Sequence, residues 1–174
     1  MIKNYTPYKI LRLFFDSPTK KFQLREICRL LKIGMPSVRL HVKRPEKEGF
    51  IDKKTDGIYP GYVAARNEKF RIYKRNDMLL RLHESGLVDF LVENFMPDAI
   101  VLFGSASWGE DVEGSDIDLF ALAKPGVIDL KEYEKMLKRR INILFEKTID
   151  DVPGELLNNI INGIVIYGYM KVLK

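Results

Sequence analysis

Apolar residues in the first third of the chain recur at helical spacing, in three segments bounded by proline or glycine. We expect helices over residues 6–16, 24–32 and 35–49. Gly34 separates the second segment from the third and predicts a tight turn between them. Pro45 lies inside the third segment. Because proline lacks an N–H and clashes with the preceding turn, this helix should end early or kink at Arg44.

Beyond these helices the hydrophobic pattern changes to the period of two that is typical of strands. Residues 50–54 predict a strand, and Asp56-Gly57 predicts the turn that follows it. We place the return strand within residues 62–73, where apolar residues such as Phe70 alternate with charged ones. The N-terminal part should therefore end in a β-hairpin.

The second half of the chain alternates helical segments with apolar runs of strand length. Asn76-Asp77 can cap a helix that reaches Glu84, and a second helix over residues 87–95 should end before Pro97, so that residues 76–96 form bridging helices. We expect strands over residues 99–103, 116–122 and 140–145, and helices over residues 130–139 and 155–162.

The composition excludes several classes of protein. The 174 residues are 46% hydrophobic and 30% charged, and no apolar run reaches the roughly 18 residues that a membrane-spanning helix needs. The first residues lack the apolar segment of a secretory signal. One cysteine and two histidines exclude an internal disulfide and a histidine-rich metal site. We therefore expect a folded cytoplasmic protein.

The net charge of +5 hides an asymmetry. Residues 1–75 contain 19 Lys and Arg against 7 Asp and Glu, a net charge of +12, whereas residues 76–174 contain 10 against 17, a net charge of −7. Such a split favours two modules with different partners. The basic module would attract a phosphate backbone, because each cation placed on a phosphate releases a condensed counterion. A merely solvated basic surface would have the same composition.

The N-terminal pattern of helices followed by a hairpin resembles a winged helix-turn-helix domain. The resemblance rests on residues 34–43 (GMPSVRLHVK) and on residues 46–51 (EKEGFI), which look like the exit into the wing. It implies that the third helix lies in the major groove of double-stranded DNA and that the wing contacts the backbone. The residues that would face DNA are Ser37, Arg39, Lys43, Arg44, Lys53 and Lys54. Winged helices also serve as protein-binding modules, and those on palindromic sites form homodimers.

The candidate chemistry follows the first apolar strand of the second half, residues 99–103. This strand ends in Gly104-Ser105, and ten residues separate Ser105 from Asp116, with Asp118 two positions further. Aspartates at positions i and i+2 of a strand point to the same face, and like charges held together in a partly buried site favour a bound cation. Mg²⁺ prefers a few carboxylates together with phosphate oxygens, and a glycine and a serine before a short helix suit a phosphate.

The strings at residues 103–109 (FGSASWG) and 114–119 (GSDIDL) resemble the signature of the minimal nucleotidyltransferases, members of the DNA polymerase beta-like superfamily. The resemblance covers residues 97–174 and implies an α/β domain with a mixed sheet flanked by helices. With a winged helix over residues 1–75, the whole chain would have the α+β class. This order of modules resembles a group of prokaryotic, often archaeal, HTH-nucleotidyltransferases.

The resemblance also implies a reaction. In this family carboxylates bind two Mg²⁺ (or Mn²⁺) ions, and a nucleoside monophosphate passes from ATP or another NTP to a hydroxyl with release of pyrophosphate. Carried onto this chain, Asp116 and Asp118 are the catalytic metal ligands. Gly104, Ser105 and Ser115 form the nucleotide-binding loop, with Ser115 shaping it.

The chain departs from the family pattern at two positions. Trp108 stands where the family has a basic residue, and it could stack on a base or pack in the core. Asn142 stands where the family has its third carboxylate; its oxygen can coordinate a metal, but it carries no charge and accepts no proton, so chemistry should be slower. The acidic residues of the preceding loop, Glu110, Asp111 and Glu113, are candidates to replace it. Arg139-Arg140 could contact a phosphate or a partner, and a solvated helix end is the favoured alternative.

Two functions follow from these expectations. The first is an Mg²⁺-dependent transferase that moves a nucleoside monophosphate to a protein hydroxyl, as an antitoxin that modifies a partner toxin of the HEPN type. The second is a transcriptional regulator that senses a nucleotide with weak or no catalysis. The Gly-Ser and Asp-x-Asp motifs favour the first, whereas Trp108 and Asn142 favour the second. A small-molecule acceptor is less favoured, because no additional substrate domain is evident.

Overall fold

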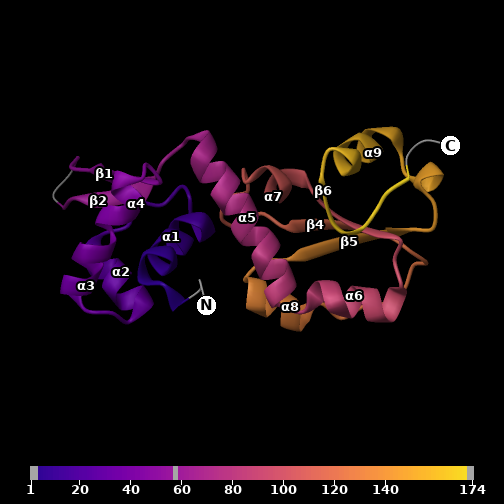
Figure 1. Ribbon diagram of the computed structural model, residues 1–174, viewed down its shortest axis with the longest axis horizontal. Coiled ribbons are helices and arrows are strands. Elements are labelled where there is room, and N and C mark those ends of the chain that lie inside the picture. Colours follow the sequence, from indigo (N-terminus) through magenta and orange to yellow (C-terminus); the bar gives the residue numbers. More distant parts are fainter. Residues whose placement is uncertain (1–3, 57–58, 172–174) are drawn as a thin grey trace. The chain divides into compact units, whose positions relative to one another are not determined.

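The computed structural model describes residues 4–56 and 59–171, and the chain divides into two compact units, Met1–Lys74 and Arg75–Lys174 (Figure 1). Each unit has its own hydrophobic core. Gly57 of the predicted hairpin turn lies outside the described residues. Among the helices of the described ranges, none combines the length and the apolar character that crossing a membrane requires.

The first unit consists of helices followed by a two-stranded antiparallel sheet. Its elements are α1 (Thr6–Asp16), α2 (Leu24–Leu31), α3 (Met35–His41), α4 (Lys43–Lys47), β1 (Ile51–Lys54), β2 (Gly61–Ala64) and the start of α5 (Glu68–Glu84). The core is built from one face of each helix, so that Ile10, Phe14, Ile27 and Val38 are fully buried. In the sheet, Ile51 pairs with Ala64.

Pro45 breaks the third predicted helix in two. In a continuous helix the N–H of residue 45 would donate to the carbonyl of His41, and proline has no N–H to donate. The structure therefore ends α3 at His41 and begins α4 at Lys43, where Pro45 lies in the first turn and needs no intrahelical donor. The predicted interruption is confirmed, and it lies at Val42, two residues before the predicted position.

The hairpin is shorter than predicted, and the helix after it is longer. The placement of Phe70 in a strand and the start of a helix at Asn76-Asp77 are both wrong, because α5 begins at Glu68. Asn67 caps it: Oδ1 of Asn67 accepts the N–H of Phe70 at 2.8 Å. The buried face of α5 contains two polar residues, Lys74 and Asp77, which interrupt the apolar stripe and hide the helical period in the sequence.

The second unit is a mixed four-stranded sheet with the strand order β5-β4-β3-β6. The strands are β3 (Ala99–Phe103), β4 (Ile117–Leu122), β5 (Ile141–Glu146) and β6 (Ile164–Gly168). The remaining elements are α6 (Leu87–Phe95), α7 (Gly104–Trp108), α8 (Lys131–Leu137), a 3-10 turn η2 (Ile149–Asp151) and α9 (Gly154–Ile161). Strand β4 is antiparallel to β3 and parallel to β5, so its first residues lie beside the end of β3 and the start of β5.

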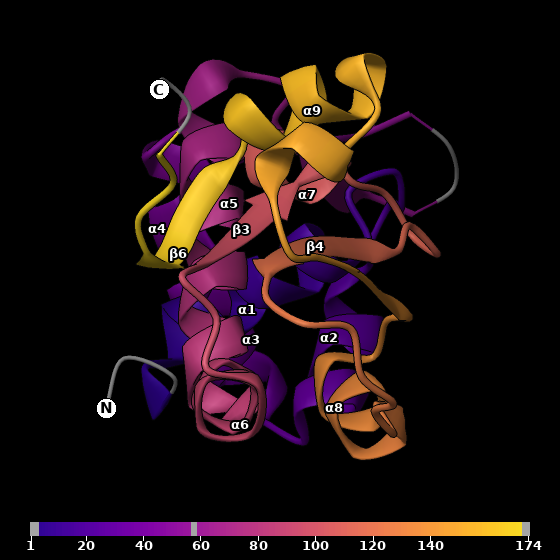
Figure 2. The ribbon, with the colours of Figure 1, turned by 90° about the vertical axis from the view of Figure 1, so that its right-hand side faces the viewer.

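Helices cover both faces of this sheet. Figure 2 shows α9 on one side and α6 and α8 on the other. The period of two along each strand explains the division: Ile100 and Leu119 pack with α6 and α8, whereas Val101 and Phe120 pack with Ile160 of α9. Asp118 has the same parity as Phe120 and therefore belongs to the α9 face, at the end of the strand where the candidate site lies, and Asp116 directly precedes that strand.

Candidate nucleotide and metal site

The turn from β3 into α7 forms one side of the candidate site. Gly104 opens α7 with a backbone φ of +69°, in the left-handed region. A Cβ added there would lie 2.7 Å from Oδ2 of Asp118, which is closer than a real Cβ approaches. The backbone conformation therefore favours glycine, and any larger residue would also displace the Asp118 carboxylate. The buried Ser107 hydroxyl fastens the turn by donating to the carbonyl of Gly104 at 2.7 Å.

The start of β4 carries the two aspartates. Asp116 directly precedes the strand, and Asp118 is its second residue. Both side chains are half-buried. In the sheet register Asp118 lies opposite Phe103 of β3 on one side and Asn142 of β5 on the other. Three neighbouring strands therefore bring Gly104, which follows Phe103, together with both aspartates and Asn142.

Asn142 joins the two carboxylates. Its Nδ2 donates to Oδ1 of Asp118 at 3.0 Å and lies 3.3 Å from Oδ2 of Asp116, to which it also donates. Since one nitrogen atom reaches both carboxylates, their oxygens converge on one point. The Asn142 side chain is exposed, so this point lies at the surface of the unit.

The residues at this point fit a hard cation. Carboxylate oxygens and an amide oxygen, which Asn142 would present after rotation of its amide group, are ligands that Mg²⁺ prefers. Among the described residues there is no group of three His, Cys, Asp or Glu side chains placed to hold a metal ion. The chain therefore offers two carboxylates at this site, and phosphate oxygens of a nucleotide would have to complete the coordination.

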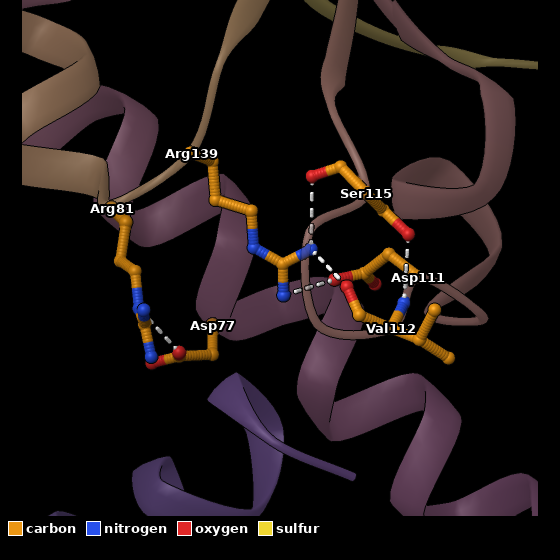
Figure 3. A network of polar contacts seen from close by, with 6 residues as sticks. All are labelled: Asp77, Arg81, Asp111, Val112, Ser115 and Arg139. Carbon is orange, nitrogen blue, oxygen red and sulfur yellow. Dashed lines mark hydrogen bonds and ion pairs between the residues drawn. The ribbon is translucent and has the colours of Figure 1, made fainter. Parts of the chain in front are cut away.

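The loop between α7 and β4 is held by buried charges (Figure 3). Nη2 of Arg139 forms an ion pair with Oδ2 of Asp111 at 3.0 Å, and the exposed fractions of these two side chains are 8% and 2%. Nη1 of Arg139 donates to the carbonyl of Val112 at 2.7 Å and to that of Ser115 at 3.2 Å. Ser115 in turn accepts the N–H of Val112 on its Oγ at 2.9 Å, so that it shapes the loop.

This network corrects two expectations. Arg139 is not a solvated helix end: α8 ends at Leu137, and the left-handed conformation of Lys138 (φ 57°) turns the chain so that Arg139 points to the loop. Asp111 does not replace the third carboxylate, because it pairs with Arg139. No sequence motif signals this pairing across 28 positions, which Figure 3 shows beside the separate Asp77–Arg81 ion pair of α5.

Two further candidates of the site are exposed. Ser105, beside Gly104 in α7, presents its side chain to solvent. Trp108, at the end of the same helix, is 54% exposed, so of its two alternatives the structure excludes packing in the core. An exposed indole leaves the alternative that Trp108 stacks on an aromatic group such as a base.

In the first unit, the candidate DNA-facing residues lie on α3, α4 and β1. The exposed members are Arg39, Lys43, Arg44, Lys53 and Lys54, and Ser37 is half-buried. Arg44 already has partners, because it donates to Glu48 at 2.8 Å and to the hydroxyl of Tyr5 at 2.5 Å. The hydrogen bond to Glu48 is the main cause that raises the pKa of Arg44. Arg39 and Lys43 are the stronger candidates for phosphate contacts.

Comparison with known proteins identifies a family for the second unit. Residues 86–171 match the family model described as polymerase beta, nucleotidyltransferase. No curated protein matches the chain. Two similar solved structures are the crystal structure of a toxin-antitoxin with AMP-PNP, at 20% identity, and that of a mutant of the toxin-antitoxin MntA-HpeT, at 18% identity. Each has a TM-score of 0.38 and is matched over 49% of this chain and 73% of the other.

Proposed function

From the premise that residues 86–171 are a polymerase beta-like nucleotidyltransferase domain, we propose that the protein transfers a nucleoside monophosphate from an NTP to a protein hydroxyl in an Mg²⁺-dependent reaction. The observation that carries the proposal is the convergence of Asp116 and Asp118 on one point beside Gly104. ATP is the proposed nucleotide, and a partner toxin of the HEPN type is the proposed acceptor, as the family resemblance implies.

The residues of the proposed site have different roles, which follow from their positions. Asp116 and Asp118 would hold Mg²⁺, which supplies charge stabilisation for the reacting phosphate oxygens when it is bound. Gly104 lets the triphosphate approach the backbone closely, and the exposed Ser105 hydroxyl can donate to a phosphate oxygen. Asn142 orients both carboxylates by its two hydrogen bonds, but it cannot take a proton from the attacking hydroxyl.

Labelled nucleotide tests this proposal. The full chain is incubated with ATP labelled at the α-phosphate, Mg²⁺ and a purified HEPN-type toxin, and label on the toxin is measured. Asp118→Asn should abolish the transfer, because the neutral amide cannot hold the cation as a carboxylate does. Asp89→Asn, an exposed position of α6, is the matched control and should transfer label normally. Equal labelling by the wild type and Asp118→Asn would refute the assignment.

Nucleotide sensing without turnover is the second candidate function, and Asn142 favours it. The carboxylates of Asp116 and Asp118 converge, as cation binding requires. Asn142, at the position of the third carboxylate, donates hydrogen bonds to both and has no basic oxygen that could take a proton. A sensor should bind ATP with Mg²⁺, which raises its melting temperature by mass action. It should do so without moving label to any acceptor.

For the first unit we propose a winged helix that binds double-stranded DNA, as a homodimer on palindromic sites. Support comes from the short helices α2 and α3 around Gly34, the antiparallel hairpin, and the exposed cations Arg39 and Lys43. The net charge of +12 over residues 1–75 favours a phosphate backbone as the partner. Nucleotide binding by the second unit would then regulate a DNA-bound protein.

A further inference from the structure

Asp116 lies outside the regular sheet, so its position depends on the loop before it. Asp118 is fixed within β4 by ladder pairing to β3 and β5. Asp116 has no such pairing, because β4 begins at Ile117. The separation of the two carboxylates is therefore set by whatever holds the backbone on either side of Asp116.

The dipeptide Arg139-Arg140 binds the backbone on both sides of Asp116. On the side before Asp116, the Arg139 guanidinium binds the carbonyl of Ser115 at 3.2 Å. On the side after Asp116, the carbonyl of Arg140 accepts the N–H of Ile117 at 2.8 Å. Two consecutive residues of one segment thus fasten the two neighbours of one metal-ligand candidate.

Arg139 also stiffens the turn that delivers Asp116. The N–H of Ser115 donates to the carbonyl of Val112 at 3.1 Å and closes a four-residue turn, in which Gly114 supplies a φ of +81°. The Val112 carbonyl accepts from Arg139 as well, at 2.7 Å. Nη1 therefore binds both ends of the turn while Nη2 binds the carboxylate of Asp111. A lysine ammonium has one nitrogen and cannot reproduce this two-sided contact in the same geometry.

The burial of Arg139 argues against direct contact with a nucleotide phosphate. Its side chain is 8% exposed, and the 2% exposed carboxylate of Asp111 neutralises its charge at 3.0 Å. A guanidinium that bound phosphate would have to leave this partner and leave a buried carboxylate behind, which is unfavourable.

We propose that Arg139, neutralised by Asp111, is a positioning residue that sets the place of Asp116 and thereby the affinity of the site for its divalent cation. The inference rests on the proposed function, because it gives Asp116 the role of a metal ligand. Groups that orient metal ligands typically change metal affinity or activity by about 10-fold to 100-fold when they are removed.

The experiment measures Mn²⁺ binding in the full chain saturated with α,β-methylene ATP, a non-reacting probe. Arg139→Lys keeps the charge and loses the fork, and Asp111→Asn removes the neutralising carboxylate. Both should raise the Mn²⁺ concentration for half-saturation by about 10-fold, with a smaller change in affinity for the probe. Arg140→Lys, the exposed neighbour that acts through its backbone carbonyl, is the matched control and should bind Mn²⁺ as the wild type does.

Ser115→Ala gives an independent variant that leaves the buried ion pair intact. It removes the acceptor of the Val112 N–H and should also weaken Mn²⁺ binding, but by a smaller factor than Arg139→Lys and Asp111→Asn do. If Asp111→Asn instead raises the affinity for α,β-methylene ATP, Arg139 acts on the phosphates of the probe and the inference is overturned. If the wild type binds the probe with Mn²⁺ and all three variants match it, the inference alone fails. A wild type that binds no probe overturns the proposed function as well.

Discussion

Replacing Asn142 with aspartate changes the centre of the site with almost no change in shape. In the structure Nδ2 of Asn142 donates to Asp118 at 3.0 Å and to Asp116 at 3.3 Å. Asn142→Asp removes both donors and places a third negative charge against the other two. Without a cation, Asn142→Asp should therefore be less stable than the wild type. Its affinity for a divalent cation should be higher than that of the wild type.

The magnitude follows from distance and exposure. Two unit charges 4 Å apart interact by about 1 kcal/mol in water and by about 4 kcal/mol at an effective dielectric constant of 20. Asn142 is exposed and the aspartates are half-buried, so the lower figure applies to each of the two pairs. A total of about 2 kcal/mol should lower the melting temperature of a unit of this size by about 8–16 °C in the absence of a cation.

Thermal unfolding in EDTA and in Mg²⁺ with ATP measures both effects. Mg²⁺ should stabilise Asn142→Asp more than the wild type, since a third carboxylate raises cation affinity and stabilisation grows with that affinity. Asn142→Ala, which loses the donors and adds no charge, is the control and should gain no extra stabilisation from Mg²⁺. The reasoning is refuted if Asn142→Asp melts as the wild type does in EDTA, or if Mg²⁺ stabilises the two equally.

Three further predictions concern other parts of the chain. Gly104→Ala and Gly86→Ala should each lower the free energy of unfolding by about 1–2 kcal/mol, because alanine is strained in the left-handed backbone conformation. Only Gly104→Ala should also lose stabilisation by ATP with Mg²⁺, because only there does the new Cβ meet a carboxylate, and equal ATP responses would contradict this. Arg39→Ala with Lys43→Ala should weaken binding of duplex DNA and reduce the slope of log affinity against log salt by about 2, and binding indifferent to salt would disprove the contact. Burial raises the pKa of Tyr62, so its contribution to stability is complete below the ordinary tyrosine value of about 10 and declines as the pH rises above it. Urea unfolding between pH 9 and 11 should show a flatter decline for Tyr62→Phe than for the wild type, and parallel declines would contradict the burial argument.

Elements with strong boundary residues were predictable from the sequence. Strand β3 (Ala99–Phe103) is continuously apolar and meets Gly104, and α6 (Leu87–Phe95) lies between Gly86 and Pro97, so the predicted and observed bounds coincide. The site shares this property in part. The parity of strand positions places Asp118 on the face of Phe120, whereas Asp116 precedes the strand and its place depends on contacts of the loop that only the fold supplies.

Features that depend on long-range pairing were not predictable. The start of α5 differs from the prediction for a local reason: the buried residues Lys74 and Asp77 break its apolar stripe, although Asp77 pairs at 2.7 Å with Arg81 one helical turn further on. The environment of Arg139 does depend on long-range pairing. A charged residue at a helix end is ordinarily solvated, and only the fold brings the carboxylate of Asp111 within 3.0 Å.

The choice between enzyme and sensor depends on how much of the site each function needs. Binding a nucleotide with its cation requires carboxylates that converge and a backbone that admits phosphate. In the proposed site Asp116 and Asp118 would meet the first requirement and Gly104 the second. Transfer requires in addition that a proton leave the attacking hydroxyl, which the amide of Asn142 cannot accept. Loss of a carboxylate there therefore costs turnover more than binding. It follows that Asn142→Asp should raise labelled transfer by a larger factor than it raises ATP affinity if the protein is an enzyme, whereas a sensor should gain affinity with no transfer at all.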